Sequence, residues 1–226
     1  KTNLVRFAEI YRRAFPGKKL MLPWGSPLFT VAYLQDPDTR PLFDGMSFDT
    51  AFFDRLPEGQ LHSCSLYVLT LLNREWSRYR KDKPLLVSVE GPCISRTAPE
   101  SLTAGEFMRN MLRCNFILSA NGVTRLLACI SAGAECASYW GEQHYSGGGL
   151  SRLTLNPYPS YAACGTMIRH LRDCEFKRVV PTPSLGIFVL EYSNVKTGEP
   201  LHVMWTVRGK VPFKAKFRQL FDAMDN

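Results

Sequence analysis

Lys83-Pro84-Leu85-Leu86-Val87-Ser88-Val89-Glu90-Gly91-Pro92 holds the clearest structural signal in this sequence. The run Leu85–Val89 is almost wholly apolar and lacks the alternation of a half-exposed strand, which predicts a parallel strand buried on both faces. Glu90 follows at the end of that strand, where a carboxylate is costly to desolvate unless something uses it. Gly91 allows a tight turn and leaves room beside the carboxylate.

The same strand pattern recurs on both sides of this segment. Strands are expected at 18–22, 46–53, 85–89 and 124–131, and they alternate with helices at 3–15, 63–79, 101–121 and 160–172. A polar, proline-rich connection is expected between the first two strands, through Asp36-Pro37 and Arg40-Pro41. The strands begin roughly 30–40 residues apart, which is typical of βαβ units in an α/β fold. Four such units fit either half of an eight-stranded barrel or a small open sheet.

A β-rich segment follows the α/β region. Leu185–Tyr192 and Leu201–Val207 read as two strands joined by a glycine-containing turn at 194–199. Residues 213–224 suit a helix or a strand, and we favour a strand because the hairpin needs a partner. The predicted division is therefore 1–177 for the α/β part and 178–226 for an antiparallel β-appendage.

Composition and charge exclude several classes of protein. Hydrophobic residues make up 45% and charged residues 21% of the 226 residues, which indicates a folded globular chain. The net charge is +8, but the basic residues are scattered among acidic ones, so no nucleic-acid partner is expected. No run approaches the roughly 18 apolar residues of a membrane span, so no membrane contact is expected either. No targeting signal is visible, and the compartment stays open.

Several chemistries lack their sequence motifs. The seven cysteines show no C-x-x-C spacing and the histidines no metal-ligand spacing, so no metal site is predicted. There is no G-x-S-x-G elbow, no G-x-G-x-x-G fingerprint after a strand and no phosphate-binding G-x-x-x-x-G-K. No cofactor is therefore expected.

Two groups of residues are candidates for chemistry. Glu90 is either a functional carboxylate or a structural one that caps the following loop or pairs with a nearby arginine such as Arg96. The loop after the last parallel strand carries aromatic rings able to stack on sugar faces, with polar groups beside them for hydroxyls, unless it only packs on itself. The binding candidates are Tyr139, Trp140, Glu142, His144 and Tyr145, with Trp24 after the first strand as a further platform. Asp49 and Asp54, by the second strand, are expected to be solvated loop carboxylates.

The order of these elements resembles clan A glycoside hydrolases. Lys-Pro, an apolar strand and Glu-Gly at 83–91 are similar to the seventh strand of that clan, which carries the nucleophile. The run LTAGEFMRNMLRCNFILSANGVTRLLAC resembles its seventh helix and eighth strand, and NPYPSYAACGTMIRHLRDC its eighth helix. The run GIFVLEYSNVKTGEPLHVMWTVRG looks like the β-sandwich strands appended to family thirty-nine-like xylosidases and iduronidases. The resemblance covers about residues 1–210.

The resemblance implies strands five to eight of a (β/α)₈ TIM barrel and the start of a β-sandwich. It implies a retaining glycosidase with Glu90 as nucleophile, a carbohydrate substrate and no cofactor. The acid/base of this clan stands on the fourth strand, so it is expected upstream of this chain, in the missing N-terminal half of the barrel. The alternatives are a carbohydrate-binding barrel without catalysis and an α/β protein that is not a glycosidase.

Overall fold

The computed structural model divides the chain into two units, which we describe separately. They comprise Lys1–Cys93 with Asn121–Cys129, and Ile94–Ala120 with Ile130–Asn226. The residues that the structure describes are 2–22, 27–49, 58, 74–75, 77–79, 86–89, 103–121, 123–127, 159–207, 209–212, 214 and 216–226.

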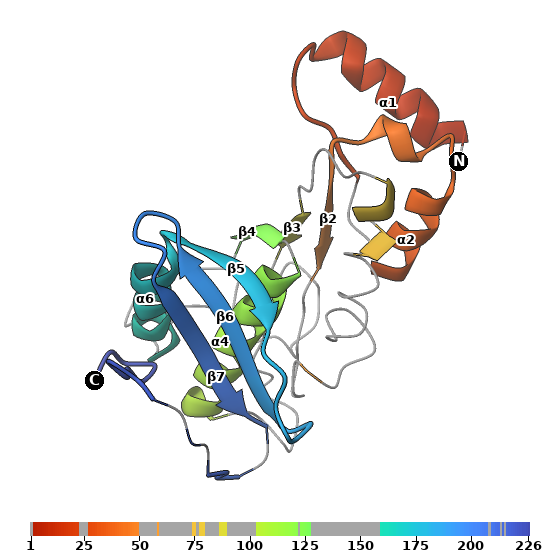
Figure 1. The fold of residues 1–226 in the computed structure, drawn as a ribbon. Helices are drawn as coiled ribbons and strands as arrows, with labels where there is room; N and C mark the ends of the chain where they lie inside the picture. Colours follow the sequence, from red (N-terminus) through yellow and green to blue (C-terminus); the bar gives the residue numbers. More distant parts are fainter. Residues whose placement is uncertain are drawn as a thin grey trace. The chain divides into compact units, whose positions relative to one another are not determined.

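The first unit contains a parallel sheet (Figure 1). Its four strands are β1 (Met21–Leu22), β2 (Gly45–Asp49), β3 (Leu86–Val89) and β4 (Val123–Leu127), and they pair in chain order. Each neighbouring pair is parallel. The prediction of four parallel strands near these positions is therefore confirmed.

The helix expected at 3–15 is α1 (Thr2–Ala14). The expected proline-rich connection is wrong in part, because it contains a second helix, α2 (Pro27–Gln35), before the short 3-10 helix η1 (Arg40–Leu42). Proline suits the first position of a helix because the N–H of that residue would have no hydrogen-bond acceptor within the helix, so its absence costs nothing. The apolar residues of α2 are distributed over all faces of the helix, so the sequence has no helical periodicity from which this helix could be predicted.

The helix expected at 63–79 lies mostly outside the described residues. Residues 74–75 and 77–79 are helical. The Arg40 guanidinium lies 4.0 Å from the centroid of the Tyr79 ring, a cation–π contact that joins η1 to this helical segment.

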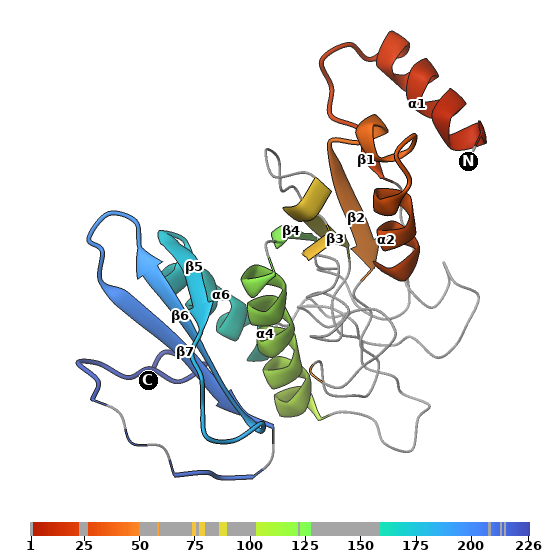
Figure 2. The same ribbon diagram turned by 45° about the vertical axis from the view of Figure 1, so that its right-hand side comes forward.

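The second unit packs two helices on an antiparallel sheet. It contains α4 (Ala104–Ala120), α6 (Pro159–Leu171) and the strands β5 (Cys174–Val179), β6 (Ile187–Asn194) and β7 (Pro200–Thr206). The three strands pair in the order β5-β6-β7. Both helices lie against one face of this sheet (Figures 1 and 2). The predicted helices and hairpin are confirmed, while β5 begins before the expected boundary at 177–178 and crosses it.

Helix α4 is the centre of the second unit. The consecutive residues Asn110–Asn115 are all buried, as expected of a helix that is covered on all sides. From α4, the Phe116 ring stacks on Trp205 of β7 at a centroid distance of 6.0 Å. Trp205 in turn stacks on Phe188, its register partner on β6, at 5.2 Å. This aromatic column joins α4 to the β-appendage.

The strand favoured at 213–224 is wrong. Residues 216–226 contain no strand or helix and end in turns built on aspartates. The Asp222 carboxylate accepts hydrogen bonds from the backbone N–H groups of Met224 and Asn226. The Phe221 ring lies 4.6 Å from the His170 ring at the end of α6, and Arg218 pairs with Glu199 in the β6–β7 turn, so this segment contacts both elements through side chains without adding a strand.

Candidate active site at the carboxyl edge of the parallel sheet

The carboxyl ends of three strands of the parallel sheet lie level with one another. Asp49, the last residue of β2, is the register partner of Val89, the last residue of β3. Val89 is also the register partner of Leu127, where β4 ends. The chain therefore leaves β2, β3 and β4 at one edge, which is the edge that carries active sites in α/β barrels.

The sequence-predicted site residues lie outside the described residues. Glu90 comes directly after Val89 in the sequence, and Trp24 follows the end of β1 at Leu22 by two positions. The remaining candidates, all from the loop after β4, are Tyr139, Trp140, Glu142, His144 and Tyr145. What the structure brings together is the backbone that precedes Glu90 and the neighbouring strand ends. Asp49 is the last residue of β2 and therefore lies at this edge. The sequence alone predicted that Asp49 would be a solvated loop carboxylate.

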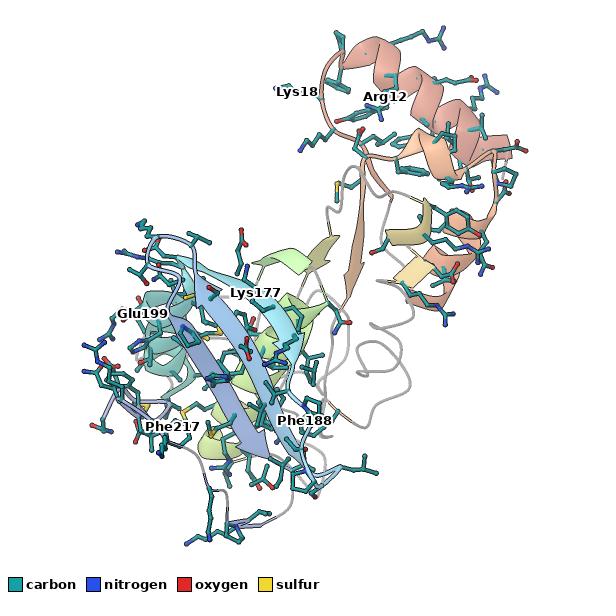
Figure 3. All side chains as sticks on the ribbon, viewed as in Figure 1. Arg12, Lys18, Lys177, Phe188, Glu199 and Phe217 are labelled. Atoms are coloured by element: carbon teal, nitrogen blue, oxygen red, sulfur yellow. The ribbon has the colours of Figure 1, made fainter. Side chains whose placement is uncertain are left out.

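An ion pair fixes the opposite, amino edge of the same sheet. The Asp44 carboxylate accepts a 2.8 Å hydrogen bond from the Leu20 N–H and a 2.7 Å bond from the Arg12 guanidinium. Arg12 also donates to the backbone carbonyls of Lys18 and Leu42. Figure 3 labels Arg12 on α1 and Lys18 in the turn that follows this helix. In α/β barrels this edge contributes stability, whereas the carboxyl edge carries chemistry.

Ion pairs on the second unit hold several carboxylates in their charged form, and two of the ion-pair clusters include a histidine. On the sheet, the Arg178 guanidinium donates two hydrogen bonds to Glu191, and this contact lowers the pKa of the Glu191 carboxyl. At the end of α6, Asp225 contacts His170 and Arg169, and the hydrogen bond with His170 is the first cause of its lowered pKa. A lowered carboxyl pKa keeps the group ionised, so neither carboxylate is poised to donate a proton at neutral pH.

Two of the described thiols are also unsuited to nucleophilic chemistry. Cys114, Cys164 and Cys174 form no disulfide. Burial raises the pKa of the Cys164 thiol to about 11, and burial likewise raises the pKa of Cys174. Both thiols are therefore protonated at neutral pH, and the thiolate is the reactive form.

The described part of the chain lacks both a metal-binding cluster and a helix that could span a membrane. No three His, Cys, Asp or Glu side chains there are grouped so that they could hold a metal ion. Among the same residues, no helix is long and apolar enough to cross a bilayer.

The fold is similar to that of a solved glycoside hydrolase structure. That protein is a family 39 glycoside hydrolase from the gut symbiont Bacteroides cellulosilyticus WH2, and the match has a TM-score of 0.66 and 16% sequence identity. The match covers 91% of this chain and 44% of that structure, so the chain spans less than half of its length. No protein-family model and no curated protein matches the sequence. At this identity the likeness concerns the fold.

Proposed function

We propose that this chain is the C-terminal half of the (β/α)₈ barrel of a retaining glycoside hydrolase, with Glu90 as its nucleophile. In this proposal β1 to β4 are barrel strands five to eight, and β5 to β7 begin a β-sandwich. The observation that carries it is the level edge of Asp49, Val89 and Leu127, with a glutamate next in sequence after Val89. The fold likeness to a family 39 glycoside hydrolase supports the same reading.

The position after β3 suits a nucleophile for a physical reason. Strand β3 is paired on both sides, with β2 and with β4, so a residue at its carboxyl end has a neighbouring strand end on either hand. In this proposal a carboxylate at that position would be held in place and only partly hydrated, which would favour attack on a bound sugar.

The proposed reaction has two steps. In the first, a Glu90 oxygen attacks the anomeric carbon and forms an ester bond, while the glycosidic C–O bond breaks and a carboxylic acid gives its proton to the leaving oxygen. In the second, the same acid/base takes a proton from water, which attacks the anomeric carbon and releases Glu90. The two carboxyl groups must stand about 5–5.5 Å apart for this outcome. Neither step requires a metal or an organic cofactor.

The partners in this proposal are a carbohydrate and the rest of the barrel. The acid/base would come from the fourth strand, in the N-terminal half that precedes this chain. The sugar would stack on Trp24, Tyr139, Trp140 or Tyr145, and Glu142 and His144 would bind its hydroxyls.

The test replaces Glu90 in the intact protein. Glu90→Ala should lower the hydrolysis of an aryl glycoside by several orders of magnitude, because the attacking oxygen is lost while the acid/base remains. Azide should restore turnover and give a glycosyl azide of inverted configuration. The matched control is Glu175→Ala, which removes an exposed glutamate of β5 and should leave turnover unchanged.

A covalent probe provides an independent readout. An activated 2-deoxy-2-fluoro glycoside should add one fluorosugar mass to the peptide that contains Glu90. The fluorine slows both steps, and the activated leaving group speeds only the first, so the covalent intermediate accumulates. Full activity of Glu90→Ala without azide would assign the chemistry to another residue. An intact protein that binds sugars but hydrolyses none of a glycoside panel would instead be a binding barrel.

A further inference from the structure

The C-terminal segment, residues 209–226, exposes several large apolar side chains. Phe217, Leu220, Phe221 and Met224 are 42%, 68%, 47% and 44% exposed. The described residues of this segment form neither a helix nor a strand, and Figure 3 labels Phe217 on it. Large apolar side chains that gather on one exposed segment indicate an interaction site, whereas scattered ones are ordinary surface.

The spacing of these four side chains is that of a helix. They stand at positions i, i+3, i+4 and i+7, so a helix would bring all of them onto one face. The sequence at 214–224, KAKFRQLFDAM, contains no glycine, proline or β-branched residue, and Pro212 precedes it, where proline favours the start of a helix. So short a helix is marginal in water by itself, and it needs a surface that buries its apolar face.

Lysines would border the apolar face of that helix on both sides. At roughly 100° per residue, Lys214 and Lys216 fall on opposite sides of the face, each about 70–90° from its centre, while Asp222 falls on the far side. Lys210, Lys214 and Lys216 are exposed, and none of the three forms an ion pair within the described part of the chain. Unpaired cations beside an apolar face are complementary to an anionic partner.

The contacts that hold the C-terminal segment in its present place are exposed. The Arg218–Glu199 pair lies in solvent, with side chains 88% and 66% exposed, so it contributes little. The Phe221 ring contacts only one side of the His170 ring and stays half-exposed. The stronger contact, between Asp225 and His170, lies beyond the four apolar positions. The apolar part of the segment can therefore change conformation while its end stays attached to α6.

We propose that the C-terminal segment folds into an amphipathic helix on the surface of an anionic lipid bilayer, with its four apolar side chains inserted and its lysines at the headgroups. Lysines on both borders of the apolar face favour a bilayer over a protein groove, because their long stems reach headgroups on either side while the face inserts. Asp222, on the far side, would face water. The sequence predicted no membrane contact because no run could span a bilayer, but a helix that lies on the surface needs no such run.

Vesicle sedimentation with the intact protein tests this proposal. Vesicles of phosphatidylcholine alone would be compared with vesicles that also contain phosphatidylserine. The protein should bind the anionic vesicles at least about 10-fold more tightly, because each lysine near the surface gains from its negative potential. Added salt should weaken this binding, since it screens the attraction. Circular dichroism should show a gain of helix on the anionic vesicles and none on the neutral ones.

Two pairs of variants test the apolar face and the helix. Leu220→Ser should weaken binding to anionic vesicles at least about 10-fold, because an inserted leucine side chain is lost. Its matched control is Ile168→Ser on α6, which removes a side chain that is 58% exposed and should leave binding unchanged. Gln219→Pro should abolish binding because proline breaks a helix interior, whereas Gln219→Ala should keep it. These side chains are exposed, so the variants should fold.

A third pair tests the lysines. Lys214→Gln combined with Lys216→Gln should remove most of the preference for phosphatidylserine. The matched control combines Lys177→Gln with Lys196→Gln, because those lysines already pair with the carboxylates of β5 and of the turn before it. The control should keep the preference.

Three outcomes would overturn the proposal. The first is an intact protein that binds neither kind of vesicle. The second is binding that survives both Leu220→Ser and Gln219→Pro, which would show that charge alone attracts the protein. The third is self-association that grows with protein concentration and is lost in Leu220→Ser, which would make a second copy the partner. None of these measurements depends on hydrolysis, so the result stands apart from the assignment of Glu90.

Discussion

The clearest test of the fold is the removal of the Asp44 carboxylate at the amino edge of the parallel sheet. In Asp44→Ala the Leu20 N–H loses its 2.8 Å acceptor, and Leu20 is buried. A buried donor left unpaired costs about 1–3 kcal/mol. The Arg12–Asp44 pair adds little, because its side chains are 40% and 20% exposed, and such pairs contribute about 0.2–1 kcal/mol. Arg12 also keeps its backbone acceptors at Lys18 and Leu42.

These contributions give a local destabilisation of about 2 kcal/mol, which corresponds to roughly a 30-fold fall in amide protection. The assay is hydrogen exchange at the amides of Leu20 and residue 44, which pair across this edge. Asp44→Asn keeps an oxygen for Leu20 and loses only the charge, so the fall should be about 5-fold, or about 1 kcal/mol. Arg13→Ala, on the exposed side of α1, should change nothing. Unchanged protection at Leu20 in Asp44→Ala would refute the reasoning.

Two further predictions concern the second unit. Thr103 and Glu106 form a capping box at the start of α4, with the Glu106 carboxylate accepting from the Thr103 N–H at 2.8 Å. Thr103→Ala should destabilise the first turn by about 1 kcal/mol and Thr103→Ser should not, as seen in the exchange of its amides. The pKa of Asp225 is lowered by His170 and Arg169, so its stabilising contact is complete above the unfolded value of 3.8 and is lost as pH falls through the folded value. The side-chain carboxyl carbon of Asp225 should therefore show its acid titration at a pH below the ordinary value of 3.8, and Asp225→Asn should abolish that transition.

The parallel strands were predictable because their sequences are apolar runs bounded by prolines and glycines. Helix α2 could not be predicted, because its apolar residues lie on all faces of the helix and show neither the helical nor the strand period. Strand β5 was missed for a different reason: Cys174–Val179 alternates polar and apolar residues, but it follows α6 with almost no turn between them. The segment 213–224 has aromatic spacing that fits either regular structure, and its packing on His170 could not be read from spacing.

The candidate site was predictable in outline only. A glutamate after a buried strand is visible in the sequence, whereas the alignment of Asp49 with Val89 depends on register, which short strands do not encode. The Arg12–Asp44 pair joins residues 32 positions apart, so no local pattern reveals it. The capping box at 103–106 was readable, since threonine followed three positions later by glutamate is a known helix-start signature.

The aromatic column of Phe116, Trp205 and Phe188 has a consequence for anyone recombining this protein with a homologue. Helix α4 lies before β4 in the chain, yet it shares its core with strands that end at Thr206. A crossover at 177–178, where the appendage seemed to start, would cut through β5 and pair a helix from one parent with a sheet from another. In chimeras with crossovers before Thr103 and after Thr206, all three rings of the aromatic column come from one parent. Strand β4 lies between these crossovers, so it is exchanged together with the second unit. The modular unit for gene shuffling is therefore wider than the β-appendage.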